Sequence, residues 1–163
     1  MPVPEAEALV GAWRDRYDPA ARMGVPAHVT LLYPFLPPAR IDSVDVDRLV
    51  GLFAVVPPQR FHLVAVRRFP GVVYLAPEPA EAIRELTVSI WTLYPEVPPY
   101  GGTFSEIVPH LTVAQTDDPA TLEEVESAVA PGLPIAASAD EAWLMVEGTE
   151  GRWRVGHRFP FLK

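Results

Sequence analysis

Two short stretches of this chain repeat one another, and they constrain the fold more than any other feature. The first covers residues 26–33 (PAHVTLLY) and the second covers residues 108–115 (VPHLTVAQ). Each contains a histidine, an apolar residue and a threonine in a row, and the two histidines lie 82 positions apart, as do the two threonines. Because both stretches are rich in β-branched and apolar residues, we predict that both are strands.

Side chains two positions apart point to the same face of a strand. His28 and Thr30 are therefore expected to face one way together, and so are His110 and Thr112. If the two strands face one groove, they place two imidazoles and two hydroxyls around one small ligand.

The elements around the two stretches are predicted in the same order in both halves of the chain. In the first half we predict a helix over residues 5–17, a motif strand over 28–35, a helix capped by Asp42 or Ser43, and hairpin strands over 60–68 and 72–76. In the second half we predict a helix opened by Pro79, a Pro/Gly-rich loop over 95–105, a motif strand over 110–115, a helix capped by Asp118, and strands over 139–147 and 152–159. Shifting the first hairpin by 82 residues places it on the second.

This repetition predicts an α+β fold built by internal duplication. We expect a single domain over residues 1–163, with halves of roughly 1–76 and 77–163, forming two pseudo-symmetric antiparallel lobes with helices outside and a central cleft. One asymmetry is expected. The strand over 72–76 precedes the helix of the second half, whereas only residues 1–3 precede that of the first, so this strand is either very short or belongs to an N-terminal extension that the chain lacks.

Composition excludes several classes of protein. The net charge of −8 argues against nonspecific binding of long nucleic acid, which depends on Lys and Arg neutralising phosphates. The chain has no cysteine, which excludes disulfides and thiolate chemistry, and we expect a cytoplasmic location. No apolar run has the length of a membrane span and the N-terminus does not resemble a secretory signal, so we expect no membrane association.

A pair of histidines across a small cleft suits acid–base chemistry. Because the imidazole pKa lies near neutrality, one ring can be neutral and accept a proton while the other is protonated and donates one. The neighbouring threonine hydroxyls can donate hydrogen bonds to phosphoryl oxygens as negative charge develops on them. This arrangement can cleave a phosphodiester without a metal, and we expect no metal site and no cofactor.

The residues 28–35 (HVTLLYPF) and 109–114 (PHLTVA) resemble the two-histidine (2H) phosphoesterases, including the bacterial 2′-5′ RNA ligase-like and cyclic phosphodiesterase proteins. The family signature is two His-x-Thr motifs with an apolar middle residue, and both motifs match. The resemblance implies a bilobal α+β fold with a central cleft. It also implies that His28 and His110 are the catalytic acid–base pair and that Thr30 and Thr112 bind phosphate.

The resemblance further implies a hydrolase acting on 2′,3′-cyclic phosphates of nucleotides or RNA ends, and a role in RNA end processing. The alternatives are a 2′-5′ RNA ligase, or a module that binds a nucleotide or RNA end without turnover. The expected partner is a small nucleotide or an RNA 3′ end, and we expect the chain to be a monomer. The resemblance does not settle which histidine is the acid and which is the base.

Other side chains are weaker candidates for contact with substrate. Tyr100 and Phe104, in the Pro/Gly-rich loop, could stack on a base. Arg152 and Arg154 share a strand face and could meet phosphates, although a solvated face is the commoner meaning. Strand parity places Tyr33 opposite His28, so we expect it in the core. The remaining expectations concern side chains without the motif: His62 and His157 are expected to be structural or at the surface, and Trp13, Trp91, Trp143 and Trp153 are expected in the core.

Overall fold

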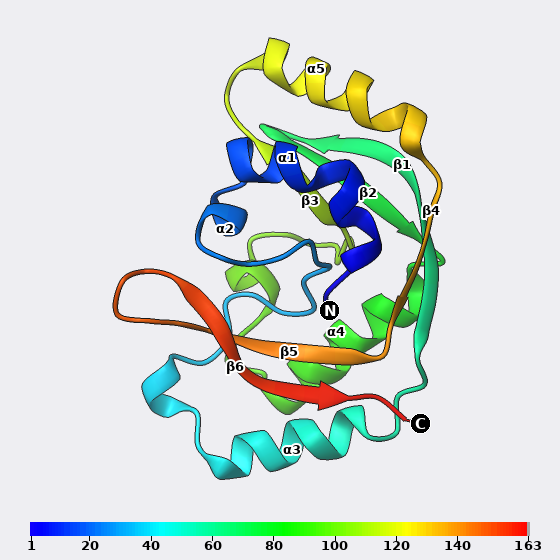
Figure 1. Cartoon of the computed structure of the whole chain (residues 1–163). Coiled ribbons are helices and arrows are strands. Elements are labelled where there is room, and N and C mark those ends of the chain that lie inside the picture. The colour runs from blue at the N-terminus through cyan, green and yellow to red at the C-terminus, as the bar shows by residue number, and fades with distance from the viewer. Residues whose placement is uncertain (163) are drawn as a thin grey trace.

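The computed structural model describes residues 1–162 and is built on two antiparallel sheets (Figure 1). The larger sheet has four strands in the order β3-β2-β1-β4, and the smaller is the hairpin β5-β6. The strands are β1 (Gln59–Phe69), β2 (Val72–Glu78), β3 (Leu111–Gln115), β4 (Ile135–Ala139), β5 (Glu141–Glu147) and β6 (Trp153–Pro160). The predicted α+β architecture with two lobes is confirmed.

The helices divide between the two sheets. Helices α1 (Glu7–Tyr17) and α5 (Pro119–Val129) pack on the four-stranded sheet, whereas α3 (Ser43–Phe53) packs on β6 and against α4 (Glu81–Leu93). The short helix α2 (Pro19–Arg22) follows α1, and the described residues also form the 3₁₀ turns η1 (Pro4–Ala6), η2 (Pro38–Arg40), η3 (Pro99–Gly102) and η4 (Ala130–Gly132). In residues 1–162, no helix is both long and apolar enough to cross a bilayer.

Local sequence signals explain where these helices begin. The Asp42 carboxylate accepts hydrogen bonds from the backbone N–H groups of Val44 and Asp45, and the Asp45 side chain accepts one from the Asp42 N–H in return. This reciprocal capping satisfies donors that the first turn of α3 would otherwise leave unpaired. At the start of α5, the Asp118 carboxylate accepts hydrogen bonds from the N–H groups of Ala120 and Thr121, and Pro119 occupies the first helical position, where a missing N–H costs nothing.

The second motif lies where it was predicted. Its strand is β3, which pairs antiparallel with β2 at the edge of the four-stranded sheet, with Thr112 opposite Tyr74. The β1–β2 hairpin turns at Gly71, whose φ of +73° is readily adopted only by a residue without a Cβ. The sheet therefore presents His110 at the start of an edge strand.

The prediction for the first motif is wrong in its extent. Residues 28–35 do not form a strand of a sheet, and their one bridge joins His28 to Pro2. The Val29 N–H donates to the Met1 carbonyl and the Val3 N–H donates to the Ala27 carbonyl, so residues 1–3 pair with the first motif through an isolated bridge, which agrees with the very short strand, one of the two alternatives. Three prolines follow in residues 34–38, and a proline cannot donate to a ladder, which prevents this segment from extending the sheet.

The predicted strand over 139–147 is also partly wrong. β4 ends at Ala139 and β5 begins at Glu141, so two strands of different sheets meet there. β4 pairs with the far edge of β1, with Ala139 opposite Gln59, and has no counterpart in the first half. Its short, alanine-rich sequence carries little of the alternation that identifies a strand.

One continuous core underlies both sheets, and it includes Val10 of α1, Val29 beside the first motif, Leu63, Val113 and Val125, all fully buried. The prediction that all four tryptophans lie in the core is wrong: Trp91 is 38% exposed, and Trp143 and Trp153 are half-buried.

Candidate active site

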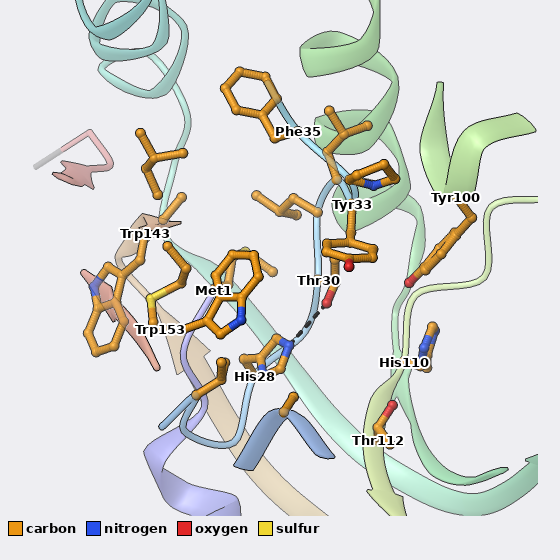
Figure 2. Close-up of a pocket in the computed structure, with 18 of the residues that line it drawn as sticks. Met1, His28, Thr30, Tyr33, Phe35, Tyr100, His110, Thr112, Trp143 and Trp153 are labelled. Carbon is orange, nitrogen blue, oxygen red and sulfur yellow. Dashed lines mark hydrogen bonds between the residues drawn. The ribbon is translucent and has the colours of Figure 1, made fainter. Parts of the chain in front are cut away.

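A cavity of about 1110 Å³ lies where the two motifs meet. His28 and Thr30 line it from the first motif, and His110 and Thr112 line it from the second. Figure 2 shows the two imidazoles on facing sides of this space, with Thr30 and Thr112 beside them. The structure thus brings together the four residues that the sequence singled out.

The His28 imidazole is oriented through both of its nitrogens. Nδ1–H donates to the Pro26 carbonyl at 2.8 Å, so in the neutral ring Nε2 carries the lone pair. The Thr30 hydroxyl lies 3.1 Å from this Nε2 and donates to it. Burial lowers the pKa of His28 to about 3, and the nearby Arg14 guanidinium adds to the effect, so the ring is neutral near pH 7.

The His110 imidazole is held by a similar hydrogen bond and by aromatic rings. Its Nδ1–H donates to the Val108 carbonyl at 2.7 Å. Phe69 and Tyr74 contact it edge-on, with ring centroids 5.1 and 5.4 Å away, and Tyr100 stacks at 6.3 Å. Burial lowers the pKa of His110 as well. In residues 1–162, Nε2 of His110 has no hydrogen-bond partner, so it is available to a ligand.

The two motifs share one local geometry. In each, the histidine donates from Nδ1 to the carbonyl of the residue two positions earlier, and these carbonyls are again 82 positions apart. The shared bond sets the same tautomer in both rings and directs both Nε2 atoms away from the backbone. The repeat seen in the sequence is therefore a repeat of side-chain orientation.

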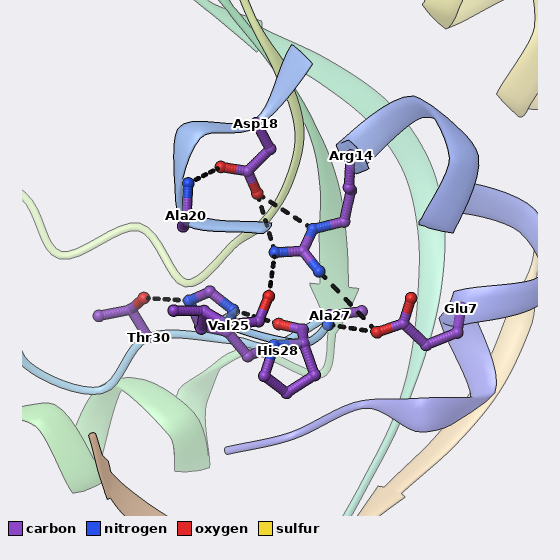
Figure 3. Close-up of polar contacts among 9 residues, drawn as sticks. Glu7, Arg14, Asp18, Ala20, Val25, Ala27, His28 and Thr30 are labelled. Carbon is purple, nitrogen blue, oxygen red and sulfur yellow. Dashed lines mark hydrogen bonds and ion pairs between the residues drawn. The ribbon is translucent and has the colours of Figure 1, made fainter. Parts of the chain in front are cut away.

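A buried ion pair supports the first motif (Figure 3). Arg14 of α1 donates to the Asp18 carboxylate at 2.8 and 3.0 Å and to the Val25 carbonyl at 3.1 Å, and both side chains are almost completely buried. The Glu7 carboxylate accepts a hydrogen bond from the Ala27 N–H at 2.6 Å. These contacts attach the segment before His28 to α1. They take the place of strand pairing, because this segment is not part of the four-stranded sheet.

The loop residues Tyr100 and Phe104 both line the cavity. Tyr100 has a φ of +51°, a strained value for a tyrosine, and its N–H donates to the Tyr33 carbonyl at 2.6 Å. Burial raises the pKa of its phenol, so it remains a hydrogen-bond donor. In Figure 2 its hydroxyl is directed into the cavity. Phe104 is 67% exposed at the mouth and contacts the Tyr100 ring edge-on.

The two candidate arginines lie elsewhere. Arg152 and Arg154 are exposed and do not line the cavity. Arg152 directly precedes β6, and Arg154 follows Trp153 within it, so strand alternation directs the Arg154 side chain to the face opposite Trp153, which does line the cavity. Both arginines are therefore exposed to solvent, which was the alternative to a phosphate contact.

Sequence reasoning missed several aromatic residues of the site, including Phe69 beside His110. Tyr33, expected in the core, is 52% exposed and lines the cavity, and its ring lies 6.4 Å from that of Trp153. Strand parity failed for Tyr33 because its segment is not a strand. The supporting pair of Arg14 and Asp18 was missed too, although an arginine four residues before an aspartate is a visible signal of a helical ion pair.

Chemically, the arrangement can transfer protons at both ends of one phosphorus-centred displacement. Two Nε2 atoms face a shared space, and hydroxyls lie beside them to stabilise developing charge. Within residues 1–162, no three His, Asp or Glu side chains gather in a way that could hold a metal ion.

Comparison with known proteins agrees with this geometry. The family model of the 2′-5′ RNA ligase superfamily matches residues 2–151. Among solved structures, one described as the crystal structure of a phosphoesterase is similar over 100% of this chain and 95% of its own, with a TM-score of 0.57 and 18% identity. At that identity the similarity concerns the fold. No curated protein matches the chain.

Proposed function

Because the chain belongs to the 2′-5′ RNA ligase superfamily and has its two-histidine phosphoesterase fold, we propose that it is a metal-independent phosphodiesterase that opens the 2′,3′-cyclic phosphate of a nucleotide or an RNA end. One observation carries the proposal: both motif histidines present Nε2 to the same cavity, each oriented by the same Nδ1 hydrogen bond.

We assign His28 as the general base and His110 as the general acid. His28 is neutral near pH 7, and its Nε2 already accepts a hydrogen bond from a hydroxyl. The Nε2 of His110 faces the cavity without a partner in the described residues, and a bound phosphate anion would favour its protonated form. Burial of both rings makes their pKa values sensitive to that anion.

The reaction is an in-line displacement at phosphorus. A water molecule forms the new P–O bond and loses a proton to Nε2 of His28. The bond to one ribose oxygen breaks, and that oxygen takes the proton from Nε2 of His110, which gives a phosphomonoester and a free hydroxyl. Thr112 donates to a non-bridging oxygen as charge develops there, and Thr30 does so once its hydroxyl turns from Nε2 of His28 to the phosphoryl group. Tyr100 is a further donor that lines the cavity.

The test is turnover of 2′,3′-cyclic nucleotides, each base in turn, in excess EDTA. We expect turnover that survives EDTA and falls about 10²–10⁴-fold in His28→Ala and in His110→Ala. His62→Ala, on an exposed position of β1, is the matched control and should retain full activity. Near-normal turnover in both motif variants would contradict the assignment.

The superfamily name keeps 2′-5′ RNA joining as the second candidate. The same histidines would serve it, with a 2′-hydroxyl in place of water as the nucleophile. Incubation with RNA fragments that end in a 2′,3′-cyclic phosphate and a 5′-hydroxyl distinguishes the two, because joining lengthens the RNA whereas hydrolysis does not. Thermal stabilisation by these ligands without any product would instead indicate a binding module.

A further inference from the structure

The walls of the cavity carry more information about the substrate than the reaction centre does. The cavity extends from the histidines into a region that we call the apolar arm, lined by Phe35, Leu49, Phe53, Ile90, Leu144 and Phe159. These side chains come from the segment after the first motif, from α3 and α4, and from the β5–β6 hairpin. At about 1110 Å³, the cavity exceeds the range of roughly 300–1000 Å³ typical of small-molecule sites.

The inner side chains of the apolar arm are packed and barely reached by solvent, whereas its outer side chains, Phe35 and Leu144, are half-buried. Leu49, Phe53, Ile90 and Phe159 are each no more than 5% exposed, although they line the cavity. Leu144 is half-buried on the β5 wall. Water forms no hydrogen bonds with apolar walls. Replacing this water with an apolar group of the ligand therefore lowers the free energy of binding, roughly in proportion to the apolar area that is buried.

The charged side chains that line the cavity are carboxylates. Asp18 is neutralised by Arg14 at 2.8 Å, which leaves Glu106 and Glu147 as its charged wall residues. Both are exposed, one in the loop before β3 and the other at the end of β5. Among residues 1–162, no arginine or lysine lines the cavity. A cleft with charge of one sign repels further charge of that sign, and the net charge of −8 acts in the same direction.

We infer that the preferred substrate is a small phosphodiester with a single negative charge and a bulky apolar group. Its phosphoryl group lies between His28 and His110, and its apolar group occupies the arm beneath β5–β6. This inference rests on the proposed function and narrows it, because oligonucleotides and other substrates with several phosphates would meet Glu106 and Glu147.

Two pairs of substrates test the inference with the wild-type protein. The first pair is glycerol 1,2-cyclic phosphate and its 3-O-octyl ether, which differ by one apolar chain. We expect the octyl ether to have a kcat/KM at least about tenfold higher, because burial of several methylene groups contributes more than one such factor. The second pair is adenosine 2′,3′-cyclic phosphate with and without a 5′-phosphate. There the added charge should lower kcat/KM by about tenfold or more.

Matched variants locate each effect. Leu144→Gln should remove most of the preference for the octyl ether, whereas the volume-conserving Leu144→Met should keep it. Glu147→Gln should reduce the penalty of the 5′-phosphate, whereas Glu150→Gln, in the β5–β6 turn outside the cavity, should not. Thermal unfolding shows whether Leu144→Gln folds, and if it does not, the wild-type comparison decides alone.

The outcomes separate the two claims. Turnover of adenosine 2′,3′-cyclic phosphate with no gain from the octyl chain, or with the 5′-phosphate tolerated, overturns the inference and leaves the proposed function standing. Failure to turn over any of the four compounds overturns the inference, and the proposed function is overturned with it only when the 2′,3′-cyclic nucleotides of the other bases are not turned over either.

Discussion

The two imidazoles that we propose as acid and base are positioned by one hydrogen bond repeated in two places. His28 and His110 each use Nδ1 on a backbone carbonyl two residues earlier, and each therefore presents Nε2 to the cavity. Their surroundings differ, since His28 meets the Thr30 hydroxyl and His110 meets three aromatic rings. This difference between otherwise equivalent rings is the physical basis for giving them different roles.

Removal of either motif hydroxyl should slow the chemical step while leaving the fold intact. Thr30→Val and Thr112→Val each replace a donor with a methyl group of similar size, and we expect kcat to fall by about 10²–10³-fold, as for a lost oxyanion donor. Steady-state kinetics on a cyclic nucleotide measures this fall. Thr92→Val, on the exposed face of α4, is the control, and equal rates in all three variants would show that the motif hydroxyls do not contact phosphate.

The dependence of kcat/KM on pH follows from the two lowered pKa values. His28, with a pKa of about 3, is neutral through most of the accessible range, so the fraction of protonated His110 controls the rate. Burial places the pKa of His110 below the ordinary imidazole value of 6.5. We therefore expect kcat/KM to fall about tenfold for each pH unit above 6.5. A profile that rises through pH 6.5 would contradict this assignment.

At the scale of elements, the two motifs are held by different means. The sheet positions the second, because β3 pairs with β2 along its length. Among residues 1–162, the first pairs only with residues 1–3, and contacts of Arg14, Asp18 and Glu7 hold it against α1 instead. The geometry of His28 thus depends on a buried ion pair as well as on backbone pairing.

Loss of that ion pair should destabilise the protein strongly. Arg14→Met leaves the buried Asp18 carboxylate without its partner, and we expect the free energy of unfolding to fall by about 3–5 kcal/mol. Chemical denaturation measures the change. Arg158→Met removes an exposed contact with Glu141 at 3.1 Å and should cost no more than about 1 kcal/mol. Similar losses in the two variants would mean that Arg14 contributes no more than a surface pair.

A lost helix cap should have a smaller effect that is separate from activity. In Asp42→Ala the first turn of α3 loses its acceptor for two N–H groups, so we expect a loss of about 1 kcal/mol in stability. Turnover should be unchanged, because the cap lies outside the cavity. Asp42→Asn retains an acceptor and should recover most of the stability, and a variant that lost activity in proportion to stability would contradict this separation.

For the whole molecule, acid should weaken the fold through His28, the histidine that we propose as the general base. The unfolded chain binds a proton at His28 below the ordinary pKa of 6.5, whereas the folded chain does so only near 3. Stability is therefore lost as the pH falls from 6.5 to 3, by about 1.4 kcal/mol per pH unit at most from this group. Urea denaturation across this range measures the decline. It should be shallower in His28→Ala than in His62→Ala, and equal slopes would contradict the assignment.

The sequence by itself determined the elements that rest on local chemistry. Asp42 and Asp118 mark helix starts because a carboxylate satisfies unpaired N–H groups nearby in the chain, and the hairpin around Gly71 follows from its turn. The 82-residue offset also identified all four motif residues, because spacing and side-chain type agree in the two motifs.

Only the tertiary structure decided features that depend on distant partners. A strand exists only where another strand pairs with it, so the apolar run after His28 stayed outside the sheet while the alanine-rich β4 entered it. Strand parity then failed for Tyr33, which lines the cavity. The apolar arm has no local signature, because α3, α4 and the β5–β6 hairpin contribute side chains that meet only when the two lobes pack. Local interactions are thus readable from neighbouring residues, whereas the shape and charge of the cleft arise from segments brought together by folding.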